Sequence, residues 1–286
     1  MISEAQFQHE LQLIIKNAIR EDVGPGDFSS LACIPNTAIG KVKLLVKDEG
    51  IIAGVAFAKM IFEYIDCNLQ FEVFIQDGMP VKYGDVVFHV SGSSQSILKA
   101  ERIVLNSMQR MSAIATKTNT YVRLLEDTNT KILDTRKTTP GFRACEKWAV
   151  TIGGGENHRF ALYDMIMLKD NHNDFAGGIT NAIQKTKTFL KDNNLDLKII
   201  VEARSIDEIK EILKNDGIHR ILIDNFNYEN TRKAVQLIGN QCQTESSGNI
   251  NEITVRHYAE CGVNYVSSGA LTHSVHNMDL SLKAIE

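Results

Sequence analysis

KIIVEARSIDEIKEILKNDGIHRILIDN, residues 198–225, is the stretch of sequence that decides the fold. It begins and ends with a short apolar run that is typical of a buried β-strand, and a helical pattern lies between the two runs. A strand, a helix and a second strand in this order predict a βα unit of a parallel sheet. We therefore expect the two runs to be neighbouring strands.

The same alternation extends through the second half of the chain. Beyond residue 130 the strand-like runs are KILD, MIMLK, KIIVE, RILID, QCQTE and VNYVSS. Their starts lie about 20 to 35 residues apart, the repeat expected for strand, loop, helix and loop in a parallel barrel. We predict an α/β fold, consisting of an incomplete TIM-like α/β barrel and a smaller N-terminal α+β domain.

The first half of the chain has a different pattern. A capping box formed by Ser3 and Gln6 begins a helix that ends before Gly24. The segment GVAFAKMIFEYI is typical of a second helix between β-rich runs, and a long helical stretch from about Ile97 connects the two domains. We predict an N-terminal domain, a barrel domain and a C-terminal tail that packs with the first domain, over residues 1–112, 113–274 and 275–286.

Composition argues against several classes of partner and site. The net charge of −4 and a pI of about 6.1 give no general attraction to nucleic acid or to an anionic membrane. No apolar run approaches the roughly 18 residues of a membrane span, and no signal-peptide pattern is visible, so we expect a cytoplasmic protein. The five scattered cysteines have no CxxC spacing, which predicts reduced packing residues rather than disulfides or a zinc site.

Polar side chains follow the six strand-like runs. In a parallel barrel the carboxyl ends of the strands meet at one face, where active sites are found. Arginine binds carboxylates through its planar fork, and lysine neutralises phosphate. A substrate with several carboxylates or phosphates is therefore predicted from the cationic set, which is Arg136, Lys137, His158, Arg159 and Lys169. The alternatives are that the two arginines form structural ion pairs and that His158 is an ordinary polar residue.

Glu202 and Asp224 are carboxylates on neighbouring strand ends. Oxygen ligands of this kind suit Mg²⁺ that is held jointly with phosphate oxygens. They equally suit contacts to ribose hydroxyls, and a third interpretation places them as a surface pair at helix N-termini, where acidic residues are favourable.

Small residues at the last two strand ends indicate a phosphate site. Ser247-Gly248 and Ser268-Gly269 place a hydroxyl and a glycine where a strand turns into a helix, and backbone N–H groups at such turns bind phosphate. His273 is a further candidate for a phosphate contact. Gly153-Gly154-Gly155 lacks the spacing of a dinucleotide-binding motif, so it predicts a tight turn that delivers the polar residues after it.

Eight stretches of the chain resemble the quinolinate phosphoribosyltransferase family. They are EDVGPGD (21–27), AERIVLN (100–106), DTRKTTPGFR (134–143), KWAVTIGGGENHRFALYDMIMLKDNH (147–172), VEA (201–203), IDN (223–225), ESSGNI (245–250) and SGALTHS (268–274). The combination of DTRKT, GGGxNHR and LKDNH is highly specific. The resemblance implies phosphoribosyl transfer from PRPP to quinolinate with decarboxylation, which gives nicotinate mononucleotide for NAD biosynthesis.

The resemblance also implies roles for individual residues. Lys137 is implied to lie near both substrates, and Arg102 to reach the active site of the neighbouring subunit in a homodimer. Glu202 and Asp224 are implied to serve PRPP and Mg²⁺. The residues implied to surround quinolinate are Arg136, His158, Arg159 and Lys169, and those implied to cradle the 5′-phosphate are Ser247, Gly248, Gly269 and His273.

Two positions depart from the family pattern, and three other functions stay open. Asn249 stands where a second glycine is usual, and Ser268 where an apolar residue is common, which implies a slightly different cradle because asparagine adopts the left-handed conformation less freely than glycine. The other functions are an aldolase-like barrel with Lys169 as its Schiff-base lysine, a phosphoribosyltransferase acting on nicotinate or another base, and a non-catalytic module that binds phosphosugars.

Overall fold

The computed structural model describes residues 2–285, and the chain divides into two compact units. The barrel unit contains residues 120–136 and 155–270, together with residue 2. The α+β unit contains residues 3–119, 137–154 and 271–285. The domain boundaries proposed from the sequence stay predictions.

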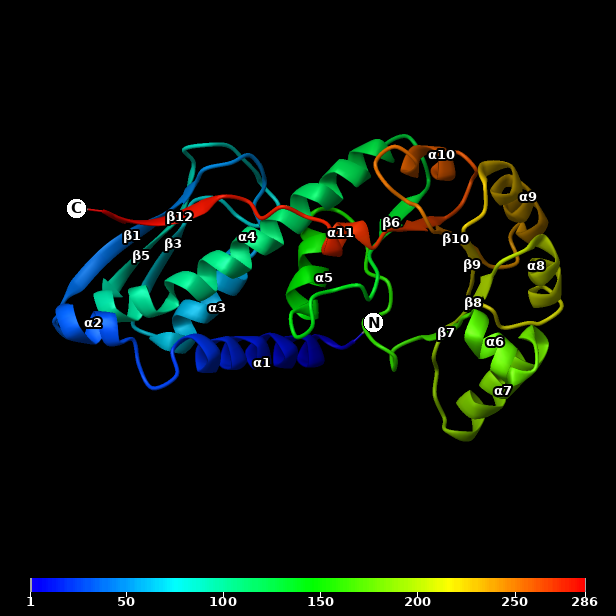
Figure 1. The fold of residues 1–286 in the computed structure, drawn as a ribbon, viewed down its shortest axis with the longest axis horizontal. Helices are drawn as coiled ribbons and strands as arrows, with labels where there is room; N and C mark the ends of the chain where they lie inside the picture. The colour runs from blue at the N-terminus through cyan, green and yellow to red at the C-terminus, as the bar shows by residue number, and fades with distance from the viewer. Residues whose placement is uncertain (1, 286) are drawn as a thin grey trace. The chain divides into compact units, whose positions relative to one another are not determined.

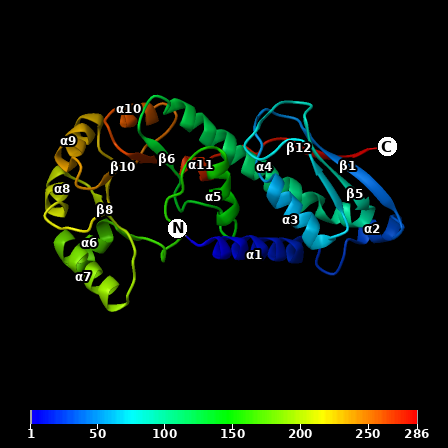
Figure 2. The ribbon, with the colours of Figure 1, turned by 180° about the vertical axis from the view of Figure 1, so that it is seen from behind.

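The α+β unit is built on an antiparallel sheet of four strands. Their order is β12 (Leu280–Ile285), β1 (Ile39–Val46), β5 (Val86–Ser93) and β3 (Gln70–Val73). Beside the sheet lie α3 (Val55–Ile65) and the long helix α4 (Ser94–Leu124), as Figures 1 and 2 show. The smaller elements are α2 (Phe28–Cys33), β2 (Gly50–Ile51), β4 (Pro80–Val81), α5 (Arg143–Ile152) and α11 (Ala270–His273).

Local capping explains where two helices of this unit begin. In α1 (Glu4–Asp22) the predicted capping box of Ser3 and Gln6 is confirmed. The start of α3 is capped from a distance, because the Asp77 carboxylate accepts hydrogen bonds from the backbone N–H groups of Val55 and Ala56 at 2.9 and 3.1 Å. Acceptors at these positions satisfy amide groups that have no partner within the helix.

The barrel unit contains a curved sheet of six parallel strands. All six strands predicted from the sequence are confirmed, and so is the α/β fold class. The strands are β6 (Lys131–Leu133), β7 (Ile166–Leu168), β8 (Ile199–Ala203), β9 (Arg220–Asp224), β10 (Gln243–Ser247) and β11 (Tyr265–Ser267), in the spatial order β6-β11-β10-β9-β8-β7.

Five helices connect these strands. They are α6 (Asp170–Ala176), α7 (Ile179–Asp192), α8 (Ile206–Ile212), α9 (Tyr228–Ile238) and α10 (Val255–Ala259), and Figure 1 shows α8, α9 and α10 on the outer side of the curved sheet. Ser205 and Asn227 cap α8 and α9. Because the strands are parallel, their carboxyl ends lie at the same edge. No helix in residues 2–285 is long and apolar enough to cross a membrane.

Candidate active site

Three neighbouring strands of the barrel unit bring acidic and hydroxyl groups together at their carboxyl ends. Glu202 lies in β8, while Asp224 and Ser247 are the last residues of β9 and β10 and face each other in the register. The Ser247 hydroxyl donates a 2.6 Å hydrogen bond to Asp224 Oδ1, and the Asn225 side-chain amide donates to Oδ2 at 2.7 Å. Asp224 is therefore fixed through both oxygens.

The environment of Glu202 disfavours its charged form. Its side chain is largely buried, and Lys169, the residue after β7, places Nζ 3.9 Å from Glu202 Oε2. Burial and the nearby Asp224 raise the pKa of Glu202, whereas Lys169 acts against them. Two neighbouring carboxylates, of which Glu202 is approached by Lys169, are a suitable place for further positive charge.

The same two carboxylates are candidate metal ligands. Within residues 2–285, no group of three or more histidine, cysteine or acidic side chains could hold a metal ion by itself. Glu202 and Asp224 offer oxygen donors, which Mg²⁺ prefers, and it commonly completes its coordination with water and substrate phosphates. The donor set therefore fits Mg²⁺ only if a ligand shares it.

Arg136 and Arg159 form no close ion pair with a carboxylate among the described residues. Arg136 Nε is buried without a hydrogen-bond partner. Arg159 is also buried, and its Nη1 donates to the Met165 carbonyl at 3.2 Å. Burial, followed by the charge of Arg136, lowers the pKa of Arg159. Neither arginine forms a close ion pair within residues 2–285, although the charge of Asp164 favours the charged form of Arg159. The buried Nε of Arg136 therefore argues against the structural interpretation for that residue and in favour of an anionic ligand.

His158 is buried among protein groups. Its backbone N–H donates to Asp134 Oδ1 at 2.8 Å, its Nδ1 accepts from the Arg159 backbone at 2.7 Å, and its Nε2 lies 3.3 Å from Glu245 Oε2. This environment fits the alternative of an ordinary buried polar residue, so a substrate contact by His158 stays a prediction.

Glu245 is a residue whose importance the sequence analysis missed. It lies inside β10 and is fully buried, with Oε2 2.8 Å from Arg220 Nη1, and the Arg220 guanidinium stacks 4.0 Å from the centre of the Tyr265 ring. Burial alone would raise the pKa of Glu245, but His158, Arg220 and Ser267 together lower it to about 2. An acidic residue in a parallel strand was a usable signal, because such strands are covered on both faces.

The predicted phosphate turn has a backbone that excludes larger residues. Gly248 has a φ of 88°, and a β-carbon there would lie 2.0 Å from Asn225 Oδ1. Asn249 has a φ of 53°, so it adopts the left-handed conformation that the more usual glycine favours. The Ser268 hydroxyl donates a hydrogen bond to the Ile250 carbonyl at 2.9 Å. This bond satisfies the hydroxyl at a position where the family commonly has an apolar side chain.

A second glycine explains the turn that precedes His158. Gly153 ends α5, and a β-carbon on it would lie 2.4 Å from the Ala115 carbonyl oxygen. Gly154 then turns the chain with a φ of 91°. The tight turn predicted from the sequence is confirmed.

Three predicted site residues belong to the α+β unit. Arg102 of α4, Lys137 and His273 all have exposed side chains, and His273 Nδ1 lies 2.6 Å from Ser274 Oγ. The approach of these residues to the barrel-unit groups stays a prediction.

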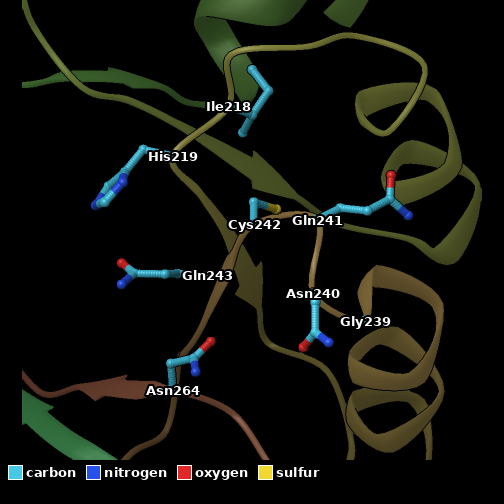
Figure 3. A pocket seen from close by; sticks show the side chains of 8 residues that line it. All are labelled: Ile218, His219, Gly239, Asn240, Gln241, Cys242, Gln243 and Asn264. Atoms are coloured by element: carbon cyan, nitrogen blue, oxygen red, sulfur yellow. The ribbon is translucent and has the colours of Figure 1, made fainter.

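An open cavity of about 430 Å³ lies at the amino ends of β9 and β10, at the other end of the strands from the site described above. Figure 3 shows its lining, which is Ile218, His219, Gly239, Asn240, Gln241, Cys242, Gln243 and Asn264. None of the predicted site residues belongs to this lining, so the cavity and the candidate active site are separate.

Comparison with known proteins agrees with the geometry. Residues 27–112 match the model for the N-terminal domain of quinolinate phosphoribosyl transferase, and residues 114–283 match the model for its C-terminal domain. The chain belongs to the quinolinate phosphoribosyltransferase family. Together the two matches cover nearly the whole sequence of this family member.

Individual relatives resemble this family member over most of their lengths. It is 44% identical to the chloroplastic nicotinate-nucleotide pyrophosphorylase [carboxylating] of Arabidopsis thaliana, over 96% of this chain and 83% of the relative. It is 38% identical to the probable enzyme of that name from Bacillus subtilis, over 96% and 93%. The crystal structure of NadC from Streptococcus pyogenes superimposes with a TM-score of 0.89 at 36% identity, over 100% and 99%.

Proposed function

We propose that this family member transfers the phosphoribosyl group of PRPP to quinolinate, and that it releases nicotinate mononucleotide, pyrophosphate and carbon dioxide in NAD biosynthesis. The observation that carries the proposal is the distribution of charge at the carboxyl ends of the barrel strands. Arg136, which has a buried nitrogen without a hydrogen-bond partner, lies in the same unit as Glu202, whose pKa is raised by burial and by Asp224 and whose carboxylate lies 3.9 Å from Lys169. This distribution suits a dicarboxylate beside a phosphorylated sugar.

Quinolinate is bound by the cationic groups. The forked guanidinium of Arg136 has a buried nitrogen available to a carboxylate, and Arg159 lies close enough to affect it electrostatically. Lys169 and Lys137 contribute point charges that neutralise carboxylate and phosphate oxygens. His158 completes the set that surrounds quinolinate, and Ser247, Gly248, Gly269 and His273 cradle the 5′-phosphate.

The reaction begins when the quinolinate nitrogen attacks the anomeric carbon of PRPP, as the bond to the pyrophosphate oxygen breaks. Positive charge develops on the ribose, where Glu202 and Asp224 stabilise it, and negative charge develops on the leaving group, where Lys137 and Lys169 stabilise it. The new pyridinium nitrogen then accepts the electron pair of the adjacent carbon–carboxylate bond. Carbon dioxide leaves, and the ring carbon takes up a proton, so no covalent enzyme intermediate is required.

Magnesium is the proposed cofactor. Glu202 and Asp224 would hold it together with phosphate oxygens of PRPP, or these carboxylates would contact the ribose hydroxyls directly. When bound, Mg²⁺ supplies neutralisation of the charge that develops on pyrophosphate.

We also propose a homodimer, in which Arg102 of one subunit reaches the active site of the other, and a cytoplasmic location. The exposed position of Arg102 on α4 supports the first proposal, and five free cysteines support a reducing compartment. Neither nucleic acid nor a membrane is a proposed partner. Light scattering and cell fractionation test these points.

The function is tested by incubating the pure protein with Mg²⁺, PRPP and quinolinate. Nicotinate mononucleotide and carbon dioxide should appear in equal amounts. Nucleotide formation from nicotinate without carbon dioxide would instead favour another base, and a borohydride-trapped adduct on Lys169 with a keto substrate would favour the aldolase-like alternative. Binding of PRPP without any turnover would favour a phosphosugar-binding module.

The role of Arg136 is tested in the same assay. Arg136→Ala should lower kcat/KM by more than about tenfold, because a charge-assisted hydrogen-bonded pair contributes about 2 kcal/mol. Arg123→Ala, which removes an exposed arginine of α4, is the matched control and should be fully active. Normal turnover of Arg136→Ala would remove Arg136 from the site.

A further inference from the structure

A partly buried polar cluster in the α+β unit, in which Thr139 is exposed, joins segments that are far apart in the sequence. The Glu146 cluster, as we name it, contains Arg110 of α4, Thr139 of the loop after β6, Glu146 of α5 and Thr272 of α11. Glu146 and Thr272 are fully buried, and the Arg110 side chain is 23% exposed. Burying a carboxylate is costly unless its oxygens are satisfied.

The Glu146 carboxylate is satisfied by two residues. Arg110 Nε donates to Oε1 at 3.0 Å, and Arg110 Nη2 lies 3.0 Å from the same oxygen. Thr139 donates its hydroxyl to Oε1 at 2.7 Å and its backbone N–H to Oε2 at 3.1 Å. Thus Glu146 binds the main chain of the loop as well as its ion-pair partner.

The cluster reaches Lys137 through a second path. Arg110 Nη2 also donates a hydrogen bond to the backbone carbonyl of Thr272. The Thr272 hydroxyl in turn donates to the backbone carbonyl of Lys137 at 2.8 Å. The main chain is therefore held at Lys137 and at Thr139, on both sides of residue 138.

We propose that Arg110, Glu146 and Thr272 are positioning residues, which fix the backbone at residues 137–139 and so direct the Lys137 side chain to the substrates. This inference rests on the proposed function, in which Lys137 contacts PRPP and quinolinate. An ion pair with a purely structural role needs no hydrogen bonds to a loop, whereas two of the contacts here end on the backbone of Lys137 and of Thr139. A lysine on a flexible stem acts well only if its backbone is fixed, because small displacements of a reacting group are costly.

Thr272→Val tests the proposal with the smallest change. It removes the hydroxyl bonded to the Lys137 carbonyl and keeps the volume of the side chain and the Thr272 carbonyl. Thr130→Val is the matched control, because the buried Thr130 hydroxyl donates to the Val263 carbonyl at 2.6 Å, at the amino end of β6. Both variants should lose a similar amount of thermal stability, but only Thr272→Val should lose kcat/KM for PRPP, by about fivefold.

A double-mutant cycle with Lys137→Ala separates positioning from a general structural effect. In the Lys137→Ala background, Thr272→Val should cause no further loss of kcat/KM. An equal loss in both backgrounds, or an equal loss in Thr130→Val, would overturn the proposal. Glu146→Gln provides an independent check, since it keeps the shape but weakens the anchor, and its loss should also disappear without Lys137.

The outcomes distinguish this inference from the function on which it rests. Absence of nicotinate mononucleotide from the wild-type protein would remove both. A fully active Lys137→Ala variant would overturn the positioning role and leave the proposed reaction standing. An impaired Lys137→Ala variant combined with normal Thr272→Val and Glu146→Gln enzymes would overturn the positioning role alone.

Discussion

Replacing Glu245 with glutamine should destabilise the barrel unit in a way that depends on pH. Glu245 is 0% exposed, and its partner Arg220, at 2.8 Å, is 7% exposed. Glutamine has nearly the same shape, but it leaves the Arg220 charge buried without a counter-ion. Removal of one partner from a buried ion pair costs about 3 to 5 kcal/mol.

The pKa of Glu245 gives a second estimate and the sign of the pH dependence. Burial, which acts to raise this pKa, is outweighed by His158 and Arg220, so the pKa falls from 4.5 to about 2. This difference corresponds to about 3 kcal/mol of stability at neutral pH. Since the folded pKa is the lower one, the stability is present above the unfolded pKa and is lost as the pH falls through the folded pKa. By pH 3 roughly 2 kcal/mol of it should be gone.

Urea denaturation at pH 7 and pH 3, followed by far-ultraviolet circular dichroism, measures both effects. Fluorescence is unsuitable here, because the single tryptophan, Trp148, belongs to the α+β unit. Glu229→Gln, which breaks an exposed pair with Lys233, is the control and should leave the midpoint unchanged. If Glu245→Gln unfolds at the same urea concentration as the wild type at pH 7, or if the difference is equal at both pH values, the reasoning is refuted.

Three further substitutions have defined outcomes. Glu202→Gln should raise the thermal midpoint at pH 8 while lowering turnover. Burial and Asp224 raise the pKa of Glu202, so the contribution of this residue to stability is present at low pH and is lost as the pH rises through the folded pKa. A lower midpoint at pH 8 would contradict this. Gly248→Ala should raise KM for PRPP at least about tenfold, because the new β-carbon would displace Asn225 from the predicted phosphate turn. An unchanged KM would exclude this turn from the PRPP site. Gly153→Ala should cost about 2 kcal/mol of stability, because its β-carbon overlaps the Ala115 carbonyl. Urea unfolding followed by Trp148 fluorescence measures this loss, and an unchanged midpoint would contradict it.

The parallel sheet was predictable because its signal is local. Each strand appears as an apolar run, and the repeat between runs fixes the order of elements. The polar residues at the ends of the runs were found in the same way, although Glu202, Asp224 and Ser247 lie inside the last part of their strands rather than after them.

Pairings across the fold could not be predicted from the sequence. Arg110 and Glu146 are separated by 36 residues, and Arg220 and Glu245 by 25, so nothing local indicates that they form ion pairs. The strand β12 was also missed, although Leu280 and Leu282 show the alternation of a half-buried strand. Its partner is β1, at the opposite end of the chain, and such a pairing depends on tertiary structure.

The charged groups of this protein fall into two populations, and the division supports the location of the active site. Glu245 and Glu146 are fully buried, and each forms an ion pair with an arginine, which offsets part of the cost of its burial. Arg136 has a buried nitrogen without a partner, and Glu202 has a raised pKa beside a second carboxylate. Groups of the second kind reduce stability when no ligand is present, and they occur at the strand ends where a ligand of opposite charge would relieve the cost. Selection for stability alone would have paired or replaced them, so their persistence at one edge of the sheet is itself an argument for binding at that edge.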